Sequence, residues 1–405
     1  MTQIITTSST TAGTNIAAAT DDEFIYIAEG VTRASTGSVA LTSGGFGGAQ
    51  VHVLGSLVGP DGVFLTDSSD SVGSYKVTIG ATGSLIGSLT GLQLADDNNT
   101  VANQGEITGY SGNGITNDGG ANFVLTNSGT IVSHGFDAVY SSGAGSEIIN
   151  YGLIQALGTF TTSDGVDFSA TAAGDAATLT NYGTISAANG AAVRGDADGV
   201  DNIYNFGLLD GDVLLFGGND VFRNAGQVVG DVNLGNGSDV FRGGGGTVEG
   251  NIAGGAGNDM IIGGVSDDAI FGGNGNDVLK GRLGEDTLVG GAGVDRMFGG
   301  ADADVFDFNS VLDSGLTAPT RDRIVDFEQG LDLIDLFDID ANTGVNGNQA
   351  FTFIGASGFS APGQVNFEQA GGNTVVQVSN DGDISPEMSF TLIGLFTLTA
   401  EDFIL

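Results

Sequence analysis

Six nonapeptides follow one another without a gap between residues 254 and 307: GGAGNDMII (254–262), GGVSDDAIF (263–271), GGNGNDVLK (272–280), GRLGEDTLV (281–289), GGAGVDRMF (290–298) and GGADADVFD (299–307). Position one is glycine, position six is aspartate and position eight is apolar in every unit. The glycine-rich half must turn sharply, and the other half is long enough only for a short strand whose apolar residue points inward. Two nonapeptides would then close one coil, and the array predicts a stack of such coils.

Stacking would bring the aspartates at position six into two columns, because alternate units share a side of the coil. The two columns are Asp259, Asp277 and Asp295, and Asp268, Asp286 and Asp304. Neighbouring strands lie about 4.8 Å apart, and two carboxylates at that spacing repel by roughly 1 kcal/mol in water and about 4 kcal/mol at an effective dielectric of 20. A divalent ion between coils, bound by both carboxylates and by turn carbonyls, would remove this repulsion. Such a set of hard oxygen ligands predicts calcium rather than zinc or copper.

At these residues the sequence resembles the RTX, or haemolysin-type, calcium-binding repeat GGxGxDxUx, whose family fold is the parallel β-roll. The resemblance implies that turn carbonyls and carboxylates of the array bind Ca²⁺. The implied metal-binding residues are Gly254, Gly255, Gly257, Asp259, Gly263, Gly264, Asp268, Gly272, Gly273, Gly275, Asp277, Gly281, Gly284, Asp286, Gly290, Gly291, Gly293, Asp295, Gly299, Gly300 and Asp304, with Asp239 in a degenerate unit upstream.

The array departs from the pattern at three positions, so we expect its sites to differ in strength. Arg282 replaces the second glycine and would weaken a site through its positive charge. Ser266 and Asp302 replace the fourth-position glycine, and Asp302 adds a carboxylate close to Asp304. The degenerate units LGNGSDVFR (234–242, with Asp239) and FGGNDVF (216–222, with Asp220) predict a junction with weaker or absent metal binding.

A second, longer repeat precedes the array. The pattern glycine-x-apolar recurs about every 24 residues, and asparagine often stands two residues before the glycine, as in NQGEI (103–107), NSGTI (127–131), NYGLI (150–154) and NYGTI (181–185). Asparagine and glycine tolerate a left-handed corner. A second turn and strand are indicated at Asn113-Gly114-Ile115, Asp137-Ala138-Val139 and Asp164-Gly165-Val166. This repeat predicts a parallel β-solenoid and resembles those of filamentous adhesins and autotransporter passengers. A set of unrelated hairpins is the alternative.

The composition restricts the partners. The chain has 405 residues, and 10 Lys+Arg against 49 Asp+Glu give a net charge of −39. Only Arg33, Lys76 and Arg194 are basic before position 223, which argues against nucleic-acid binding. Cysteine is absent, so disulfides and thiolate metal sites are excluded. We expect neither a membrane span nor an N-terminal Sec signal, because no apolar run is long enough and the first 32 residues contain no Lys or Arg.

The last hundred residues contain short apolar runs separated by turn residues and predict an antiparallel or solenoid-capping β module. DRIVDFEQGLDLIDL (322–336), FTFIG (351–355) and the terminal LTAEDFIL (398–405) resemble the C-terminal domain of serralysin-type secreted proteases. That resemblance implies an uncleaved secretion signal, read by a type I ABC exporter, that includes Asp402, Phe403, Ile404 and Leu405. A last amphipathic strand is the alternative interpretation of the terminus.

No catalytic constellation is found in the sequence. The only histidines, His52 and His134, do not form the H-E-x-x-H motif of a zinc protease, and G-x-S-x-G does not occur. Three carboxylates, Asp137, Asp164 and Asp167, could line a groove, but their separation cannot be read from sequence, and as corner residues they have a structural role. We therefore predict no catalytic and no organic-cofactor residues, and assign no active site.

Together these features predict an all-β, extracellular, calcium-binding protein. We expect an N-terminal cap (1–50), a parallel β-helix (51–232), an RTX β-roll (233–307) and a C-terminal cap with the secretion signal (308–405). The favoured function is a structural or adhesive surface or matrix protein, such as an S-layer component, whose folding is triggered by calcium and which self-associates or binds a cell-surface glycan. The alternative is a secreted polysaccharide-acting enzyme on the β-helix. A pore-forming toxin is disfavoured, because no long apolar or amphipathic helix is indicated.

Overall fold

The computed structural model describes residues 2–11, 16–17, 23–37, 40–42, 48–66, 74–169, 176–381, 383 and 385–405. Short β-strands account for nearly all the regular structure in these ranges, and a single turn of 3₁₀ helix, η1 (Ala400–Asp402), lies near the C-terminus. No helix in the described ranges is long and apolar enough to cross a membrane. The chain divides into two compact units, Met1–Gly230 and Asp231–Leu405.

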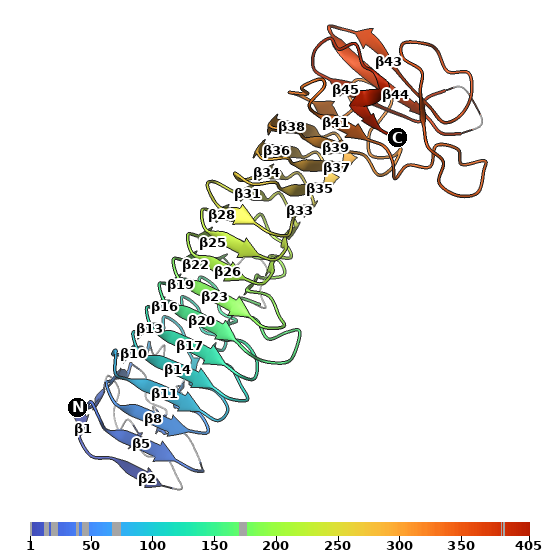
Figure 1. Ribbon diagram of the computed structural model, residues 1–405. Helices are drawn as coiled ribbons and strands as arrows, with labels where there is room; N and C mark the ends of the chain where they lie inside the picture. Colours follow the sequence, from blue (N-terminus) through green and yellow to red (C-terminus); the bar gives the residue numbers. More distant parts are fainter. Residues whose placement is uncertain are drawn as a thin grey trace. The chain divides into compact units, whose positions relative to one another are not determined.

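The first unit is a parallel β-helix with three strands per coil, and each strand pairs in parallel with the strand three places earlier (Figure 1). The first sheet contains β1 (Thr2–Ile5), β4 (Phe24–Ile27), β7 (Gln50–Val53), β10 (Lys76–Ile79), β13 (Thr100–Asn103), β16 (Val124–Asn127), β19 (Glu147–Asn150), β22 (Ala176–Asn181), β25 (Val200–Asn205) and β28 (Val221–Asn224). The second contains β2 (Ser9–Thr11), β5 (Thr32–Ser35), β8 (Ser56–Gly59), β11 (Ser84–Gly87), β14 (Glu106–Gly109), β17 (Thr130–Ser133), β20 (Leu153–Ala156), β23 (Thr184–Ala187), β26 (Leu208–Asp210) and β29 (Gln227–Val229). The third contains β3 (Ile16–Ala17), β6 (Leu41–Thr42), β9 (Val63–Thr66), β12 (Leu92–Ala95), β15 (Ile115–Asn117), β18 (Val139–Ser141), β21 (Val166–Asp167), β24 (Val193–Arg194) and β27 (Val213–Leu214).

The glycine-x-apolar repeat places one apolar column in the core. Ile107, Ile131, Ile154 and Ile185 stand in register on β14, β17, β20 and β23, and all four are fully buried. Each buried side chain of this size contributes about 1.5–3 kcal/mol through removal of apolar surface from water. The predicted β-solenoid is therefore confirmed, and its coils are held together by inward columns of branched apolar residues.

The asparagines of this repeat have a different role from the predicted one. Their backbones are not left-handed, and their side chains are buried in a continuous amide ladder. In that ladder the Nδ2 of each asparagine donates to the Oδ1 of the next one, at 2.8 Å, 2.8 Å, 2.8 Å, 2.9 Å and 2.8 Å along Asn103, Asn127, Asn150, Asn181, Asn205 and Asn224. The glycines that follow are required by close stacking, since a Cβ on Gly129 would meet the carbonyl oxygen of Gly105. The expectation of a left-handed corner was wrong, because neighbouring coils satisfy the amides directly.

Coils are already present in the segment for which a separate N-terminal cap was predicted. Thr2 pairs with Phe24 on β4, and Phe24 pairs with Gln50 on β7, both in parallel. Residues of β4 alternate between more exposed and fully buried positions, and Ile25 and Ile27 are the buried ones. This alternation, rather than the glycine-x-apolar pattern, explains why the segment forms coils. The described residues of this segment therefore belong to the β-helix itself.

The second unit opens with a β-roll of two strands per coil (Figure 1). One sheet contains β30 (Val232–Asn236), β33 (Asn251–Ala256), β35 (Ala269–Gly275), β37 (Thr287–Gly293), β39 (Val305–Asp307), β41 (Leu333–Asp335) and β46 (Phe403–Ile404). The other contains β31 (Val240–Arg242), β34 (Met260–Ile262), β36 (Val278–Leu283), β38 (Arg296–Ala301) and β40 (Arg323–Ile324). A further short strand, β32 (Thr247–Val248), lies between β31 and β33 in the sequence.

The register of the roll follows the nonapeptides. Ile261, Leu279 and Met297 are aligned on one sheet, and Ile270, Leu288 and Phe306 are aligned on the other. These six residues occupy position eight of their units, and all are fully buried. The predicted stack of coils, each built from two nonapeptides, is therefore confirmed.

The C-terminal module combines antiparallel and parallel pairing. β43 (Gln364–Ala370), β44 (Asn373–Ser379) and β45 (Met388–Leu392) form an antiparallel meander, and β42 (Thr352–Phe353) pairs in parallel with β43. β45 then pairs in parallel with β40, and β46 pairs with β41, so the module extends both sheets of the roll. The predicted capping β module is confirmed. Asp402 and Phe403 are buried in it.

Candidate metal centre

The structure places the array's aspartates in the two predicted columns. Asp259, Asp277 and Asp295 immediately precede β34, β36 and β38, and Asp268, Asp286 and Asp304 precede β35, β37 and β39. Each of the six is at most 4 % exposed. The short D-x-U strands fix this placement, since their apolar residue must enter the core and the aspartate stands two residues before it.

Hydrogen bonds connect each aspartate to the next coil. The backbone N–H of Asp259 donates to Oδ1 of Asp277 (2.8 Å), and the N–H of Asp277 donates to Oδ1 of Asp295 (2.8 Å). The other column repeats this pattern, from Asp268 to Asp286 (2.8 Å) and from Asp286 to Asp304 (3.0 Å). One oxygen of each of these carboxylates is therefore fixed by the backbone, and the orientation of the other is set.

The second carboxylate oxygen is buried without a hydrogen-bond partner among the described residues. This holds for Oδ2 of Asp259, Asp277, Asp286, Asp295 and Asp304. Asp268 differs, because its Oδ2 accepts from the N–H of Gly264 (2.6 Å). A buried, unpaired anionic oxygen is costly unless a cation or a proton compensates it. Rows of such oxygens fit a hard divalent cation, which accepts several carboxylate and carbonyl oxygens at once.

Glycines leave space for these oxygens. A Cβ on Gly254, Gly272 or Gly290, the first residue of its unit, would lie 2.5–2.6 Å from Oδ2 of the aspartate five residues later. Apart from Gly264, the glycines at positions two and four have left-handed backbones, for example Gly273 (φ 107°) and Gly275 (φ 134°), which L-residues rarely adopt. The turns therefore bring backbone carbonyls close to the carboxylates at a bend that glycine alone adopts without strain.

Burial makes the columns poor sites for free negative charge. Burial, together with the smaller effect of neighbouring aspartates, raises the pKa of Asp286 and Asp295 to about 7 and the pKa of Asp277 and Asp304 to about 6. Burial also raises the pKa of Asp259 and Asp268. In the absence of a cation, Asp286 and Asp295 are therefore partly protonated at neutral pH.

Two of the three departures from the pattern, Arg282 and Asp302, have consequences in the structure. Arg282 and Asp302 adopt left-handed backbones (φ 92° and 81°), which store strain at non-glycine residues. The Arg282 guanidinium donates to the carbonyl oxygen of Gly244 (2.8 Å). The charge of Asp302 contributes to the raised pKa of Asp304, so this added carboxylate does act on the neighbouring ladder position.

Two further aspartates extend the columns beyond the array, and sequence reasoning missed their role. The N–H of Asp295 donates to Oδ1 of Asp322 (2.8 Å), and the N–H of Asp304 donates to Oδ1 of Asp332 (3.1 Å). Burial raises the pKa of Asp322 to about 8, and its Oδ2 is also without a hydrogen-bond partner among the described residues. The signal was present, since Asp322-Arg323-Ile324 and Asp332-Leu333-Ile334 repeat the D-x-U pattern, but insertions lengthen the steps and hide the period. At the other end, the N–H of Asp239 donates to Oδ1 of Asp259 (2.8 Å).

A separate carboxylate cluster lies in the β-helix. Asp137, Asp164 and Asp167 are buried, and each offers an oxygen within 4.8 Å of the others. The N–H of Asp164 donates to Oδ1 of Asp137 (2.9 Å), and Oδ2 of Asp164 lies 4.0 Å from Nε of Arg194. Burial raises the pKa of all three, that of Asp137 to about 7. Asp137 and Asp167 also line a hollow of about 450 Å³ on the surface of the helix.

The match to a family model agrees with the roll geometry. The family model of the RTX calcium-binding nonapeptide repeat, described as four copies, matches residues 250–279 and 271–306. A solution structure of the AlgE6R3 subunit of the Azotobacter vinelandii mannuronan C5-epimerase is similar to this chain at 28% identity, over 36% of this chain and 78% of that one, with a TM-score of 0.28. No curated protein matches the sequence. The matched segment consists of RTX repeats, and Ca²⁺ is the ion that such repeats bind.

Proposed function

We propose that the protein is a secreted structural or adhesive component of a cell surface or extracellular matrix, whose second unit folds when it meets extracellular calcium. One observation carries this proposal. In the roll, buried carboxylate oxygens stand in two columns without hydrogen-bond partners among the described residues. A cation therefore belongs to the folded state of this unit, and its binding free energy is part of the folding free energy.

The ligands in this proposal are the array's aspartates, through Oδ2, and the carbonyls of the turn glycines. Calcium supplies the positive charge that offsets both the desolvation of the carboxylates and their mutual repulsion. The backbone N–H groups hold Oδ1 of each aspartate, so that Oδ2 is presented to the ion. Asp322 and Asp332 extend the ligand columns, and Arg282 weakens the site nearest to it.

Export by a type I ABC exporter fits the same coupling. Among the terminal residues that resemble the secretion signal, Asp402 is 2 % exposed and Phe403 is 8 % exposed in the folded unit, and Ile404 and Leu405 are half-buried. A signal of this kind is readable only before folding. The low calcium of the cytosol keeps the roll unfolded, and the calcium of the medium then completes the fold at concentrations on the order of 10⁻⁴–10⁻³ M.

The adhesive or structural role predicts calcium-dependent association. Static light scattering of the full chain should show assembly, or labelled protein should attach to producing cells, only when calcium is present. Magnesium at the same concentration is the matched control, because it demands octahedral geometry and retains its waters. A chain that stays monomeric and does not attach at saturating calcium would refute this role.

The second candidate function is a polysaccharide-acting enzyme, and the cluster of Asp137, Asp164 and Asp167 beside a hollow favours it. Paired carboxyl groups with different proton affinities are what glycosidic bond cleavage requires. Against it, the same aspartates accept backbone hydrogen bonds at corners of the helix, as Asp164 does from the N–H of Ala191 (2.6 Å). Turnover of a glycan panel by the native chain, lost in Asp164→Asn, would establish the enzyme and overturn the non-enzymatic proposal.

A further inference from the structure

Basic side chains gather on one face of the roll, in a chain with 10 Lys+Arg against 49 Asp+Glu. Arg242 on β31, Lys280 on β36, Arg296 on β38 and Arg323 on β40 all belong to the same sheet. The residues that alternate with them enter the core, while Arg242, Arg296 and Arg323 are exposed and Lys280 is half-buried. Four of the ten Lys and Arg residues of the chain therefore point outward from four short strands of this sheet.

The cations of this basic face reinforce one another. Arg296 is the register partner of Arg323, so two guanidinium groups start from directly neighbouring positions. Lys280 is paired with Phe298, and its ammonium lies 4.8 Å from the centre of that ring, with the Arg296 guanidinium at 5.6 Å. Among the described residues no ion pair joins any of these cations to a carboxylate. Like charges at paired positions destabilise a sheet unless an anion lies between them.

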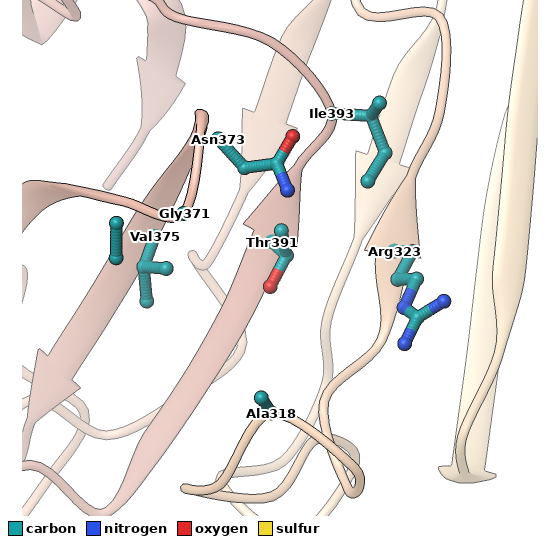
Figure 2. A pocket seen from close by; sticks show the side chains of 8 residues that line it. Ala318, Arg323, Gly371, Asn373, Val375, Thr391 and Ile393 are labelled. Atoms are coloured by element: carbon teal, nitrogen blue, oxygen red, sulfur yellow. The ribbon is translucent and has the colours of Figure 1, made fainter.

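A hollow of about 430 Å³ adjoins the end of this face (Figure 2). Arg323 is the one charged residue among those that line it. Asn373 and Thr391 supply an amide and a hydroxyl, and Val375 and Ile393 supply apolar surface. Oδ1 of Asn373 accepts from the N–H of Gly394 (3.1 Å), and Figure 2 shows its amide nitrogen on the side of Thr391.

We infer that the basic face and this hollow bind an anionic glycan, a sugar chain that carries carboxylate or sulfate groups. The guanidinium of Arg323 matches the planar geometry of a carboxylate or the tetrahedral oxygens of a sulfate. The amide and hydroxyl fit sugar hydroxyls, and the apolar side chains fit the C–H face of a ring. Arg323, Arg296 and Lys280 lie on the successive strands β40, β38 and β36 and would meet successive anionic groups, because neighbouring strands repeat at about 4.8 Å. Arg242 lies two strands beyond Lys280, since β34 stands between β31 and β36, and would meet a more distant group.

This ligand is compatible with the acidity of the whole molecule. At physiological ionic strength charges separated by more than about 8 Å are largely screened. The nearby charges therefore set the field at the basic face, and these are the four cations and Asp326, whose pKa burial raises overall although the charge of Lys280 lowers it. The hollow is concave, and Arg323 is the one charged residue that lines it. This shape and charge favour a sugar unit over the flat acidic surface of another protein. The inference rests on the proposed function, since it names the ligand class through which the protein would adhere.

Isothermal titration calorimetry on the full chain in saturating calcium tests the inference. The probes are short oligogalacturonates, sulfated oligosaccharides of similar length, and neutral cello-oligosaccharides. We expect binding of at least one anionic set, no binding of the neutral set, and an affinity that falls with added salt. Arg323→Gln and Arg296→Gln should each weaken binding about tenfold or more, because each removes a charge-assisted contact. Lys76→Gln, which removes an exposed charge from the first unit, is the matched control and should leave the affinity unchanged.

Circular dichroism of the same samples, with calcium and with chelator, separates this inference from the proposed function. A chain that folds with calcium and binds no anionic glycan refutes the inference alone. Equal losses in Lys76→Gln and Arg323→Gln, or equal binding of neutral sugars, also overturn it. Self-association without glycan that disappears in Arg323→Gln would assign the basic face to a second copy of the chain and would likewise refute the glycan site.

Discussion

Gly290→Ala is the substitution that most selectively disturbs one ladder aspartate. A Cβ at this position would lie 2.6 Å from Oδ2 of Asp295 and 3.1 Å from its Cβ and Cγ, and the three nearest atoms all belong to that side chain. The backbone of Gly290 does not have a left-handed φ, so alanine adds no backbone strain. The added methyl group therefore acts through the carboxylate that we propose as a calcium ligand.

The size of the effect follows from the geometry. Ordinary van der Waals contact begins at 3.4 Å, so Oδ2 must retreat by about 0.8 Å from its place. Oδ1 cannot follow freely, because it accepts from the N–H of Asp277 (2.8 Å). Disturbing the support of a metal ligand typically costs 10–100-fold in metal affinity, and we expect a loss of about that size. Asp295→Asn should cost as much, since it removes the charge.

Calcium titrations followed by circular dichroism measure this effect. Gly245→Ala is the matched control, because a Cβ there meets nothing within 4 Å. Gly290→Ala should shift the midpoint to higher calcium, and enough calcium should restore the fold. The double variant Gly290→Ala/Asp295→Asn should lose less than the sum of the single losses, because both changes act on one ligand. A Gly290→Ala midpoint equal to that of Gly245→Ala would refute the reasoning.

Three further outcomes are expected. Burial raises the pKa of Asp137 and of Asp201, on β25, to about 7, well above the ordinary aspartate pKa of about 3.9. The folded first unit therefore binds protons more tightly than the unfolded chain, and its stability falls as pH rises from about 4 to about 7. Thermal unfolding in chelator should show this decline, and Asp137→Asn and Asp201→Asn should each flatten it. Asn150→Ala interrupts the amide ladder and removes the partner of the buried Oδ1 of Asn181 and of the partly buried N–H of Gly152. The loss should be about 1–3 kcal/mol in urea unfolding, and a loss under about 1 kcal/mol would contradict the ladder's role. Arg282→Gly relieves left-handed backbone strain of about 1–3 kcal/mol and removes a cation beside the aspartate column. Calcium affinity measured by titration calorimetry should therefore rise. An unchanged or lower affinity would count against our account of Arg282.

The aspartate columns were predictable because every nonapeptide has the same length, so alternate units must align. Asp322 and Asp332 were not predicted, because loops of different length separate them from the array and interrupt the nine-residue period. Hydrogen bonds of the ladder span 18 residues within the array but 27 and 28 residues at its end. A period is readable from sequence only while insertions are absent.

In the β-helix the sequence indicated which residues recur but not what they contact. The asparagine positions were identified correctly, but their amide ladder was not predicted. Each asparagine side chain bonds to another asparagine one coil away, and such a contact leaves no local pattern in the sequence. Asp137, Asp164 and Asp167 were singled out, yet their mutual distance depends on two loops of different length. Similarly, the basic face of the roll joins residues from strands that are far apart in sequence, and only the register brings them together.

Hydrogen–deuterium exchange resolved to residues 254–307, with calcium and with chelator, tests the central claim most directly because it reports on the roll separately from the β-helix. Our account predicts fast exchange throughout this segment in chelator and cooperative protection once calcium reaches on the order of 10⁻⁴–10⁻³ M. Strong protection of the same amides in calcium-free solution at neutral pH would contradict it.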